Sequence, residues 1–338
     1  MEKRTKIIAT IGPACDSEDM LEKLMLAGMD IARINFSHAT HNEFATIWDT
    51  IDKLNRKHNS DVKTLIDLQG PRIRVGTLPD SGVELKENST VVFTTDYSSH
   101  NQAIYINDPY LHSDIEVGHP LYLANGDLEL TVTEKKGAEI TAKVIRGGIL
   151  YSRKGISVPE TNLTTSGLTE KDMRDIAFGL EHGANYIALS FVKNEKDIHK
   201  AREATLGKNI LLCAKIEIKQ AINNLDEIIK ASDVIMIARG DLGIELPLEQ
   251  IPLLQKKIIK LCIQLNKPAV VATQMFMSMV NHYRPTRAEI SDAANAILDG
   301  ASMLMLSDET AFGKYPIQAV EYLVKTILEI ESFQKTNS

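Results

Sequence analysis

Two short apolar runs near the middle of the chain, each ending in charge, most constrain its fold. Residues 211–217 read LLCAKIE and residues 234–243 read VIMIARGDLG, with a helical segment between them. This pattern is typical of buried parallel strands whose carboxyl ends expose functional groups. Lys215 and Glu217 are two residues apart, so they point to the same side of a strand. Glu217 and Asp241 can then share a divalent cation beside Lys215, or they only cap the helices that follow.

The same alternation of strand and helix extends through most of the chain. Strands are expected at residues 6–13, 31–38, 64–69, 186–191, 211–217, 234–243, 269–275 and 303–309. Helices are expected between them, at about 17–27, 42–57, 169–182, 248–265 and 317–331 among others, with Ser17 as an N-cap. Thr286 and Glu289 form a capping box that starts another helix and so can be wholly structural.

One segment interrupts the alternation. Apolar residues alternate with polar ones between residues 72 and 154, and residues 135–137, KKG, predict a hairpin turn. We therefore expect an inserted all-β domain at 72–154, able to close over the sheet as a lid. The rest of the chain, 1–71 and 155–338, has about 250 residues, the usual length of a (β/α)8 TIM barrel. An open doubly wound sheet is the competing fold, but no Gly-x-Gly-x-x-Gly follows the first strand.

A barrel would bring the polar residues at the strand ends to one rim. These residues are Arg33, Asn35, Ser37, Asp67, Lys215, Glu217, Asp241, Thr273, Ser307 and Glu309. The row at positions 33, 35 and 37 lies on one face of a strand and needs either a ligand or a solvated edge. Parallel strands in such folds are covered on both faces, which favours a ligand.

Composition and charge exclude several classes of protein. The net charge of -7 over 338 residues argues against nucleic-acid binding. No apolar run approaches the roughly 18 residues of a membrane span, and no targeting segment is visible. Three cysteines without a CxxC pair indicate free thiols in a reducing compartment, which predicts a cytoplasmic protein.

Six motifs occur in the order and context of a known family. They are IGPA at 11–14, ARINFSH at 32–38, KIE at 215–217, ARGDLG at 238–243, ATQM at 272–275 and RPTRAE at 284–289. Together with the β insertion they resemble pyruvate kinase from Thr5 to about Ala319. The resemblance implies transfer of the phosphoryl group of phosphoenolpyruvate to ADP, followed by protonation of the enolate to pyruvate. Such chemistry depends mainly on positioning and on cations around spread negative charge.

The resemblance also implies roles for single residues. Arg33 and Lys215 would contact the phosphoryl group, and Glu217 with Asp241 would hold Mg2+ or Mn2+. The N–H groups of Gly240 and Asp241 and the Thr273 hydroxyl would bind the substrate carboxylate. Contacts to nucleotide phosphates are implied for Asn35, Phe36, Ser37, His38, Arg74 and Lys154. The proton relay is implied for Thr273, Ser307 and Glu309, in no particular rank.

One departure from the family concerns K+. Residues 67–72 read DLQGPR, where most familiar members read DTKGPE and use the Thr, the Asp and the Asn-x-Ser row to coordinate K+. Leu68 cannot coordinate a cation, so we predict that the Arg72 guanidinium replaces K+ and that activity does not require a monovalent cation. The site or its replacement comprises Asn35, Ser37, Asp67 and Arg72. The alternative is that Arg72 is a solvated hinge residue.

Further departures concern single positions and length. Asp308 stands where the family usually has Gly, Ile218 where it has Asn, and Ala124-Asn125 before Gly126 where an acidic pair is usual. The chain ends soon after the eighth helix, so we expect a short form without the carboxyl-terminal effector domain and without a response to fructose 1,6-bisphosphate. We expect a homodimer through the barrel helices or a monomer.

Two other functions stay open at this stage. A Mg2+-dependent lyase or aldolase acting on pyruvate or phosphoenolpyruvate would use the same carboxylate pair, but it has no use for the lid or for Arg74. A catalytically silent binding homologue has no physical need for all of Arg33, Lys215, Glu217, Asp241 and Thr273.

Overall fold

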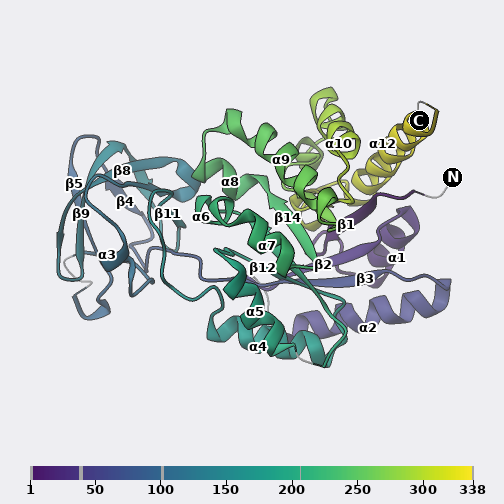
Figure 1. Ribbon diagram of the computed structural model, residues 1–338, viewed down its shortest axis with the longest axis horizontal. Helices are drawn as coiled ribbons and strands as arrows, with labels where there is room; N and C mark the ends of the chain where they lie inside the picture. The colour runs from purple at the N-terminus through teal and green to yellow at the C-terminus, as the bar shows by residue number, and fades with distance from the viewer. Residues whose placement is uncertain (1–2, 38–40, 100–102, 206, 337–338) are drawn as a thin grey trace.

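Eight parallel strands form a closed barrel in the computed structural model, which describes residues 3–37, 41–99, 103–205 and 207–336 (Figure 1). The strands are β1 (Lys6–Thr10), β2 (Ile31–Asn35), β3 (Lys63–Asp67), β12 (Tyr186–Leu189), β13 (Leu211–Ile216), β14 (Val234–Ala238), β15 (Ala269–Ala272) and β16 (Met303–Leu306). Each strand pairs in parallel with its neighbours in chain order, and β1 closes the barrel against β16. The expected (β/α)8 fold is confirmed, and the open doubly wound sheet is excluded.

Helices surround the barrel on the outside (Figure 1). They are α1 (Glu18–Ala27), α2 (His41–His58), α4 (Glu170–Glu181), α5 (Glu195–Ala204), α6 (Lys219–Asn223), α7 (Leu225–Ala231), α8 (Arg239–Glu245), α9 (Ile251–Gln264), α10 (Arg287–Asp299), α11 (Asp308–Ala311) and α12 (Pro316–Thr336). Ser17 caps α1 and the Thr286–Glu289 capping box opens α10, as the sequence indicated. The short helices α8 and α11 follow β14 and β16 directly and were not expected as separate elements.

The barrel strands divide their side chains between two cores. On β14, Val234 and Met236 belong to the core inside the barrel, whereas Ile235 and Ile237 pack against the surrounding helices. Successive side chains of a strand point to opposite faces, and both faces are buried here. This explains why the strands read as continuous apolar runs. It also determines which residue of each strand faces the barrel axis at its carboxyl end.

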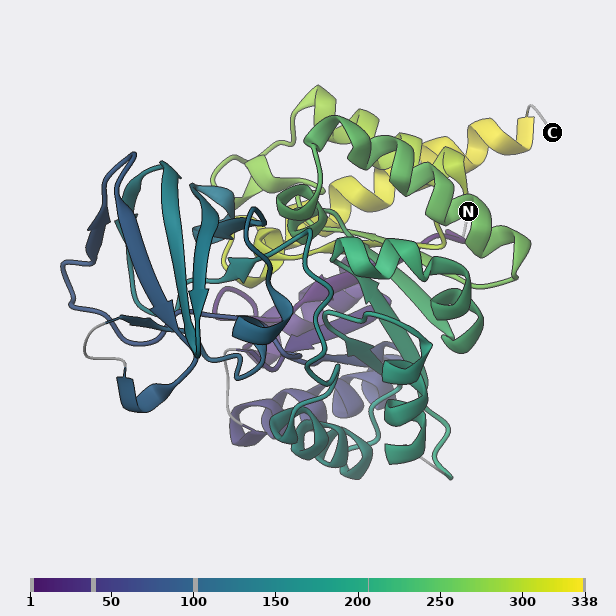
Figure 2. The same cartoon turned by 60° about the vertical axis from the view of Figure 1, so that its left-hand side comes forward.

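The inserted domain has its own sheets and its own core (Figure 2). Its strands are β4 (Val83–Leu85), β5 (Thr90–Thr94), β6 (Ile104–Tyr105), β7 (Pro120–Leu123), β8 (Leu128–Lys136), β9 (Glu139–Arg146), β10 (Gly148–Leu150) and β11 (Ile156–Ser157). Six of them form one sheet in the order β11-β7-β8-β9-β5-β6, and β10 pairs with β4. The hairpin between β8 and β9 turns at Gly137, as expected. A short helix, α3 (Leu111–Asp114), was not anticipated.

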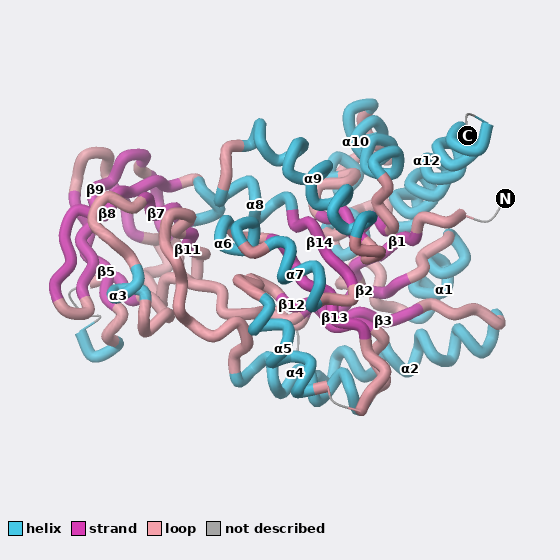
Figure 3. The backbone as a smooth tube through the Cα atoms, viewed as in Figure 1, coloured by secondary structure: helices cyan, strands magenta, loops and turns pink. Residues whose placement is uncertain are grey.

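The inserted domain lies beside the carboxyl end of the barrel, next to α6 and α8 (Figure 3). Its sheet is extended by β11, which pairs with β7, so pairing continues to Ser157. The division at residues 71/72 and 154/155 stays a prediction. Gly70 adopts a φ of 67°, a left-handed conformation that favours glycine, at the point where the chain leaves the barrel.

No helix in the described part of the chain is long and apolar enough to cross a bilayer. The three cysteines are free and buried. Burial raises the pKa of the Cys15 thiol to about 11, so this group stays protonated and unreactive at neutral pH.

Candidate active site

The inward-facing positions of three strands, β2, β3 and β13, carry charged groups at the carboxyl rim. Cys213 belongs to the interior core, so Lys215 and Glu217, which follow at steps of two, face the barrel axis. Ile31 and Leu65 belong to the same core and precede Arg33 and Asp67 by two residues. The alternation of side chains along the strands thus directs these groups toward the barrel axis, as expected. Their contacts show how closely they approach one another.

Asp67 lies at the centre of a buried charge cluster. Its Oδ2 accepts a hydrogen bond from Arg33 Nε at 2.7 Å, and its Oδ1 lies 3.1 Å from Lys215 Nζ. The carboxylate is only 1% exposed. Burial opposes its ionisation, but the charges of Lys215 and Arg33 outweigh burial and lower the pKa of Asp67. Arg33 also donates to the Thr10 hydroxyl at 2.8 Å, which fixes the guanidinium across β1, β2 and β3.

Lys215 has an oxygen for each of its three N–H bonds. Ser190 Oγ lies at 2.8 Å from Nζ, Glu217 Oε1 at 2.9 Å and Asp67 Oδ1 at 3.1 Å. Burial alone would lower the pKa of Lys215, but the charges of Asp67 and Glu217 raise it. The ammonium is thus positively charged and held in a defined position before any ligand binds.

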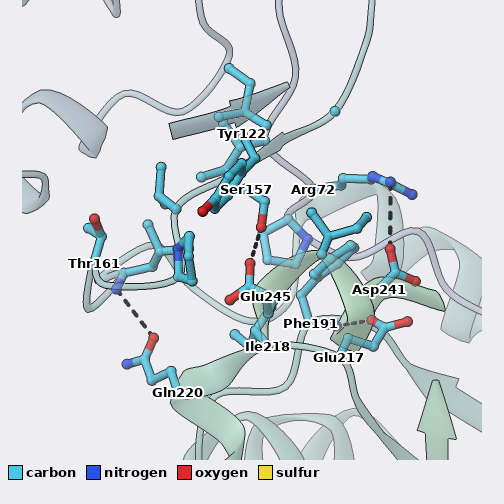
Figure 4. A pocket seen from close by; sticks show the side chains of 18 of the residues that line it. Arg72, Tyr122, Ser157, Thr161, Phe191, Glu217, Ile218, Gln220, Asp241 and Glu245 are labelled. Atoms are coloured by element: carbon cyan, nitrogen blue, oxygen red, sulfur yellow. Dashed lines mark hydrogen bonds and ion pairs between the residues drawn. The ribbon is translucent and has the colours of Figure 1, made fainter. Parts of the chain in front are cut away.

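Glu217 and Asp241 line the same pocket between the barrel and the inserted domain (Figure 4). Glu217 Oε2 accepts the N–H of Phe191 at 2.7 Å. Burial raises the pKa of Glu217, and the nearby charge of Asp241 adds to the rise, although Lys215 opposes it. Two mutually repelling carboxylates beside a pocket with about 60 Å³ of free space are a donor set suited to a hard divalent cation.

Metal binding here would need ligands from outside the chain. Within the described residues, no group of three or more His, Cys, Asp or Glu side chains is placed to hold a metal. Mg2+ usually keeps several waters and binds through one or two carboxylates together with substrate phosphates. Two carboxylates therefore fit a Mg2+ shared with a ligand, and they do not fit an all-protein cage.

The expected carboxylate-binding groups already contact one another. Thr273 Oγ accepts the N–H of Gly240 at 2.7 Å and donates to the Ala272 carbonyl at 2.6 Å. Thr273 adopts a φ of 69°, which is strained for a β-branched residue. Arg239 holds this backbone by donating to the carbonyls of Ala272 and Thr273 and by pairing with Asp292. A substrate carboxylate would have to replace the hydroxyl at the Gly240 N–H.

The proton-relay candidates differ in their surroundings. Glu309 is fully buried, and its two oxygens accept the N–H groups of Phe276 at 2.9 Å and Ser307 at 2.7 Å. Both oxygens of the Glu309 carboxylate thus serve to join the loop after β15 to the end of β16. Ser307 and Thr273 are partly exposed at the rim, where a ligand can reach them.

Four basic residues, Arg72, Arg74, Arg153 and Lys154, lie where the chain enters and leaves the inserted domain. The backbone of Arg74 forms an antiparallel β-bridge with Gly155, which follows Lys154. The Arg74 guanidinium donates to the Arg153 carbonyl at 3.0 Å. Arg72 Nη2 lies 3.3 Å from Asn125 Oδ1 and 3.6 Å from Asp241 Oδ1.

Arg72 also packs over the ring of Phe191. The contacts of this guanidinium are thus with the Asp241 side of the site, whereas the cations on Asp67 are Arg33 and Lys215.

The loop after β2 is only partly described. Asn35 Oδ1 accepts the N–H of Ser37 at 3.1 Å, and Lys171 Nζ donates to the Phe36 carbonyl at 2.7 Å. The Phe36 ring is 1% exposed and stacks on Phe44, so its side chain belongs to the helical core. His38 lies outside the described residues.

Sequence reasoning missed two residues of the cluster, Thr10 and Ser190. Thr10 is the last residue of β1, and Ser190 directly follows β12; each lies two positions after an interior core residue, Ile8 and Ala188 respectively. Counting in steps of two from the strand interior would have found both.

Comparison with known proteins gives a consistent result. The family model described as pyruvate kinase, barrel domain, matches residues 2–320. A pyruvate kinase of Geobacillus stearothermophilus is 42% identical over 337 residues, which cover 98% of this chain and 57% of that protein. Those of Thermococcus litoralis and Thermotoga maritima are also 42% identical, over 98% and 97% of this chain and 71% of each relative. The chain thus spans between about half and three quarters of these relatives' length.

Proposed function

The chain belongs to the pyruvate kinase family, and we propose that it transfers the phosphoryl group of phosphoenolpyruvate to ADP, giving pyruvate and ATP. The observation that carries this proposal is the buried cluster of Arg33, Asp67 and Lys215 beside the carboxylate pair of Glu217 and Asp241. Phosphoryl transfer needs fixed cations around a migrating negative charge and little covalent chemistry from the protein.

Arg33 and Lys215 are the proposed ligands of the phosphoryl group. Both are held in place by Asp67, which is buried and ionised, so neither has to reorganise when charge develops. Lys215 can turn one N–H from Glu217 to a phosphoryl oxygen while its hydrogen bonds to Ser190 and Asp67 persist.

Glu217 and Asp241 are the proposed ligands of Mg2+ or Mn2+. The bound ion would supply charge neutralisation for the phosphate and enolate oxygens. Gly240, Asp241 and Thr273 form the proposed carboxylate site, and Thr273 and Ser307 are the better placed relay candidates because both oxygens of Glu309 are engaged.

Nucleotide binding is proposed at the junction of the barrel and the inserted domain. Arg74 and Lys154 lie on adjacent segments there, and Asn35 ends β2 while Ser37 lies just beyond it at the barrel rim. Residues of the inserted domain contact α8. Closure of this domain over the barrel rim can therefore bring the nucleotide to the phosphoryl group.

A coupled assay tests the proposal. Phosphoenolpyruvate, ADP and Mg2+ should yield equal amounts of ATP and pyruvate, and Glu217→Gln should abolish this. Glu249→Gln, on an exposed residue that is not among those lining the pocket, is the matched control and should leave the rate unchanged. Pyruvate and inorganic phosphate in equal amounts without ATP would refute transfer to ADP, and no turnover would indicate either the lyase or aldolase or a silent binding homologue.

Independence from K+ is a second part of the proposal. The Leu68 side chain is buried and carries no ligand atom, and Arg33 and Lys215 already engage the oxygens of Asp67. Arg72 adds a positive charge to the pocket wall near Asp241. Activity should be the same with K+, Na+ or a large organic cation, and a tenfold activation by K+ would refute independence.

The oligomeric state is a separate part of the proposal. Light scattering would distinguish the predicted homodimer from a monomer.

A further inference from the structure

The chain turns where β12 ends, and Ser190 forms the first half of this turn. Its hydroxyl oxygen lies 2.7 Å from the carbonyl of Leu68, 3.2 Å from Asp67 Oδ1 and 2.8 Å from Lys215 Nζ. The residue is only 3% exposed. A hydroxyl has one proton and two lone pairs, so the shorter contact takes the proton to Leu68. A lone pair then faces Lys215.

Phe191 forms the second half of the turn and contacts the other functional side chain. Its φ is 55°, a left-handed conformation that bulky residues rarely adopt. In this conformation its N–H donates to Glu217 Oε2 at 2.7 Å (Figure 4). Strain of this kind persists only where the surroundings hold it, and it concentrates at functional sites.

Gly70 packs closely against the turn. A Cβ added at Gly70 would lie 2.7 Å from the carbonyl oxygen of Ser190 and 3.0 Å from its Cβ. The Gly70 N–H is itself held by Asp172 Oδ1 at 3.0 Å. The turn therefore has no room to move toward the segment that leads into the inserted domain.

We propose that Ser190 and Phe191 are positioning residues for phosphoryl transfer, with the Ser190 hydroxyl orienting the Lys215 ammonium and the Phe191 N–H orienting the Glu217 carboxylate. The inference rests on the proposed function and deepens it. When Lys215 turns one N–H to a phosphoryl oxygen, Ser190 and Asp67 hold the other two. Without the hydroxyl, the ammonium keeps only its contacts to the two carboxylates, and it loses the third contact that fixes its direction.

The first test is kinetic. Ser190→Ala should lower kcat about 10- to 100-fold and change KM for phosphoenolpyruvate less than about threefold, because misplacing a reacting group slows chemistry more than binding. Ser232→Ala is the matched control, because Ser232 is also buried and its hydroxyl also donates to a carbonyl at 2.7 Å, but it precedes β14 at the opposite end of the barrel. A normal kcat in Ser190→Ala would overturn the proposal.

A double-mutant cycle tests whether Ser190 acts through Lys215. In a Lys215→Met background, measured from the residual rate at high enzyme concentration, Ser190→Ala should cost less than about threefold. An equal loss in both backgrounds would overturn the proposal. Gly70→Ala, which pushes on Ser190 without removing its hydroxyl, should reproduce the kcat loss of Ser190→Ala.

A chemical measurement separates this inference from the proposed function. The rate at which acetic anhydride labels Lys215, followed by peptide mass spectrometry, should rise several-fold in Ser190→Ala and stay unchanged in Ser232→Ala. Absence of ATP formation by the unsubstituted chain would refute the proposed function, and labelling would still decide whether Ser190 holds Lys215. Unchanged labelling in Ser190→Ala would refute the positioning role.

Discussion

The barrel rim and the junction with the inserted domain hold their charged groups in different ways. At the rim, Asp67 and Lys215 are 1% and 9% exposed, and their oxygen and nitrogen atoms contact partners at 2.7 to 3.1 Å. At the junction, the Arg72 side chain is 29% exposed, and its contacts to Asn125 and Asp241 are 3.3 and 3.6 Å long.

The difference indicates that the two regions have different roles. Strand geometry presets the rim, so the groups proposed to act on the phosphoryl group cost little reorganisation when they react. The junction residues lie on segments joining two separate cores, so their positions depend on how the inserted domain sits on α8. Substitutions should therefore change kcat or stability at the rim and nucleotide affinity at the junction.

The largest expected effect is on catalysis at the rim. Lys215→Met should lower kcat about 1,000-fold or more, because one cation that stabilises the transferred group is worth that much. Steady-state assays at saturating substrate measure it, with Lys256→Met as the control, since Lys256 pairs with Asp299 on the surface. A loss below tenfold would show that the rim does not act as a preset cation site.

The next effect is on stability at the rim. Asp67→Asn should reduce the free energy of unfolding at pH 7 by about 3 kcal/mol, because it leaves Arg33 and Lys215 buried beside a neutral group. Asp52→Asn, in an exposed pair with Arg56, should change it by less than about 0.5 kcal/mol.

The loss of unfolding free energy caused by Asp67→Asn should depend on pH. The pKa of Asp67 is lowered in the folded chain, so its contribution is complete above the ordinary value of about 4 and is lost as the pH falls through the lower folded value. Urea unfolding at pH 7 and near pH 3 should show the two proteins converging in acid. A constant difference would contradict the assignment of the charge to Asp67.

A smaller effect is expected at the junction. Arg74→Ala should raise KM for ADP about tenfold, the value of one charge-assisted hydrogen bond, and should leave kcat within about threefold. Lys143→Ala, on an exposed residue of β9 in the same domain, is the control. A fall in kcat as large as that of Lys215→Met would remove the distinction between the two regions.

The smallest effect is expected for Asn125→Ala. Its hydrogen bond with Arg72 is long and partly exposed, so kcat/KM should change less than about threefold. Initial rates at low substrate concentration measure this ratio. A change above tenfold would show that the inserted domain is held in place at the junction as firmly as the rim is held by its strands.

Much of the site could be predicted from strand periodicity. Arg33 and Asn35, and likewise Lys215 and Glu217, share a face because side chains repeat every two residues. Gly240 and Thr273 could be associated only by resemblance, and the direct hydrogen bond between them emerged from the structure. The roles assigned to single residues remain predictions.

Arg72 shows where such prediction ends. Its position in the chain, just after Gly70-Pro71, suggested a partner at Asp67, yet its contacts are Asp241, Asn125 and the ring of Phe191. A long side chain on a segment between two domains can extend in several directions. Which direction it takes depends on the packing of the surrounding residues, and this packing cannot be inferred from the local sequence.

The amino-acid sequence by itself determined the alternation of strands and helices, the barrel, the inserted β domain and the polar row at the strand ends, because these follow from local periodicity and chain length. Tertiary structure alone decided that Ser190, Asp67 and Glu217 surround one ammonium and that Phe191 is held in a strained turn. These contacts join strands far apart in sequence, and their distances depend on barrel closure, which no local pattern encodes.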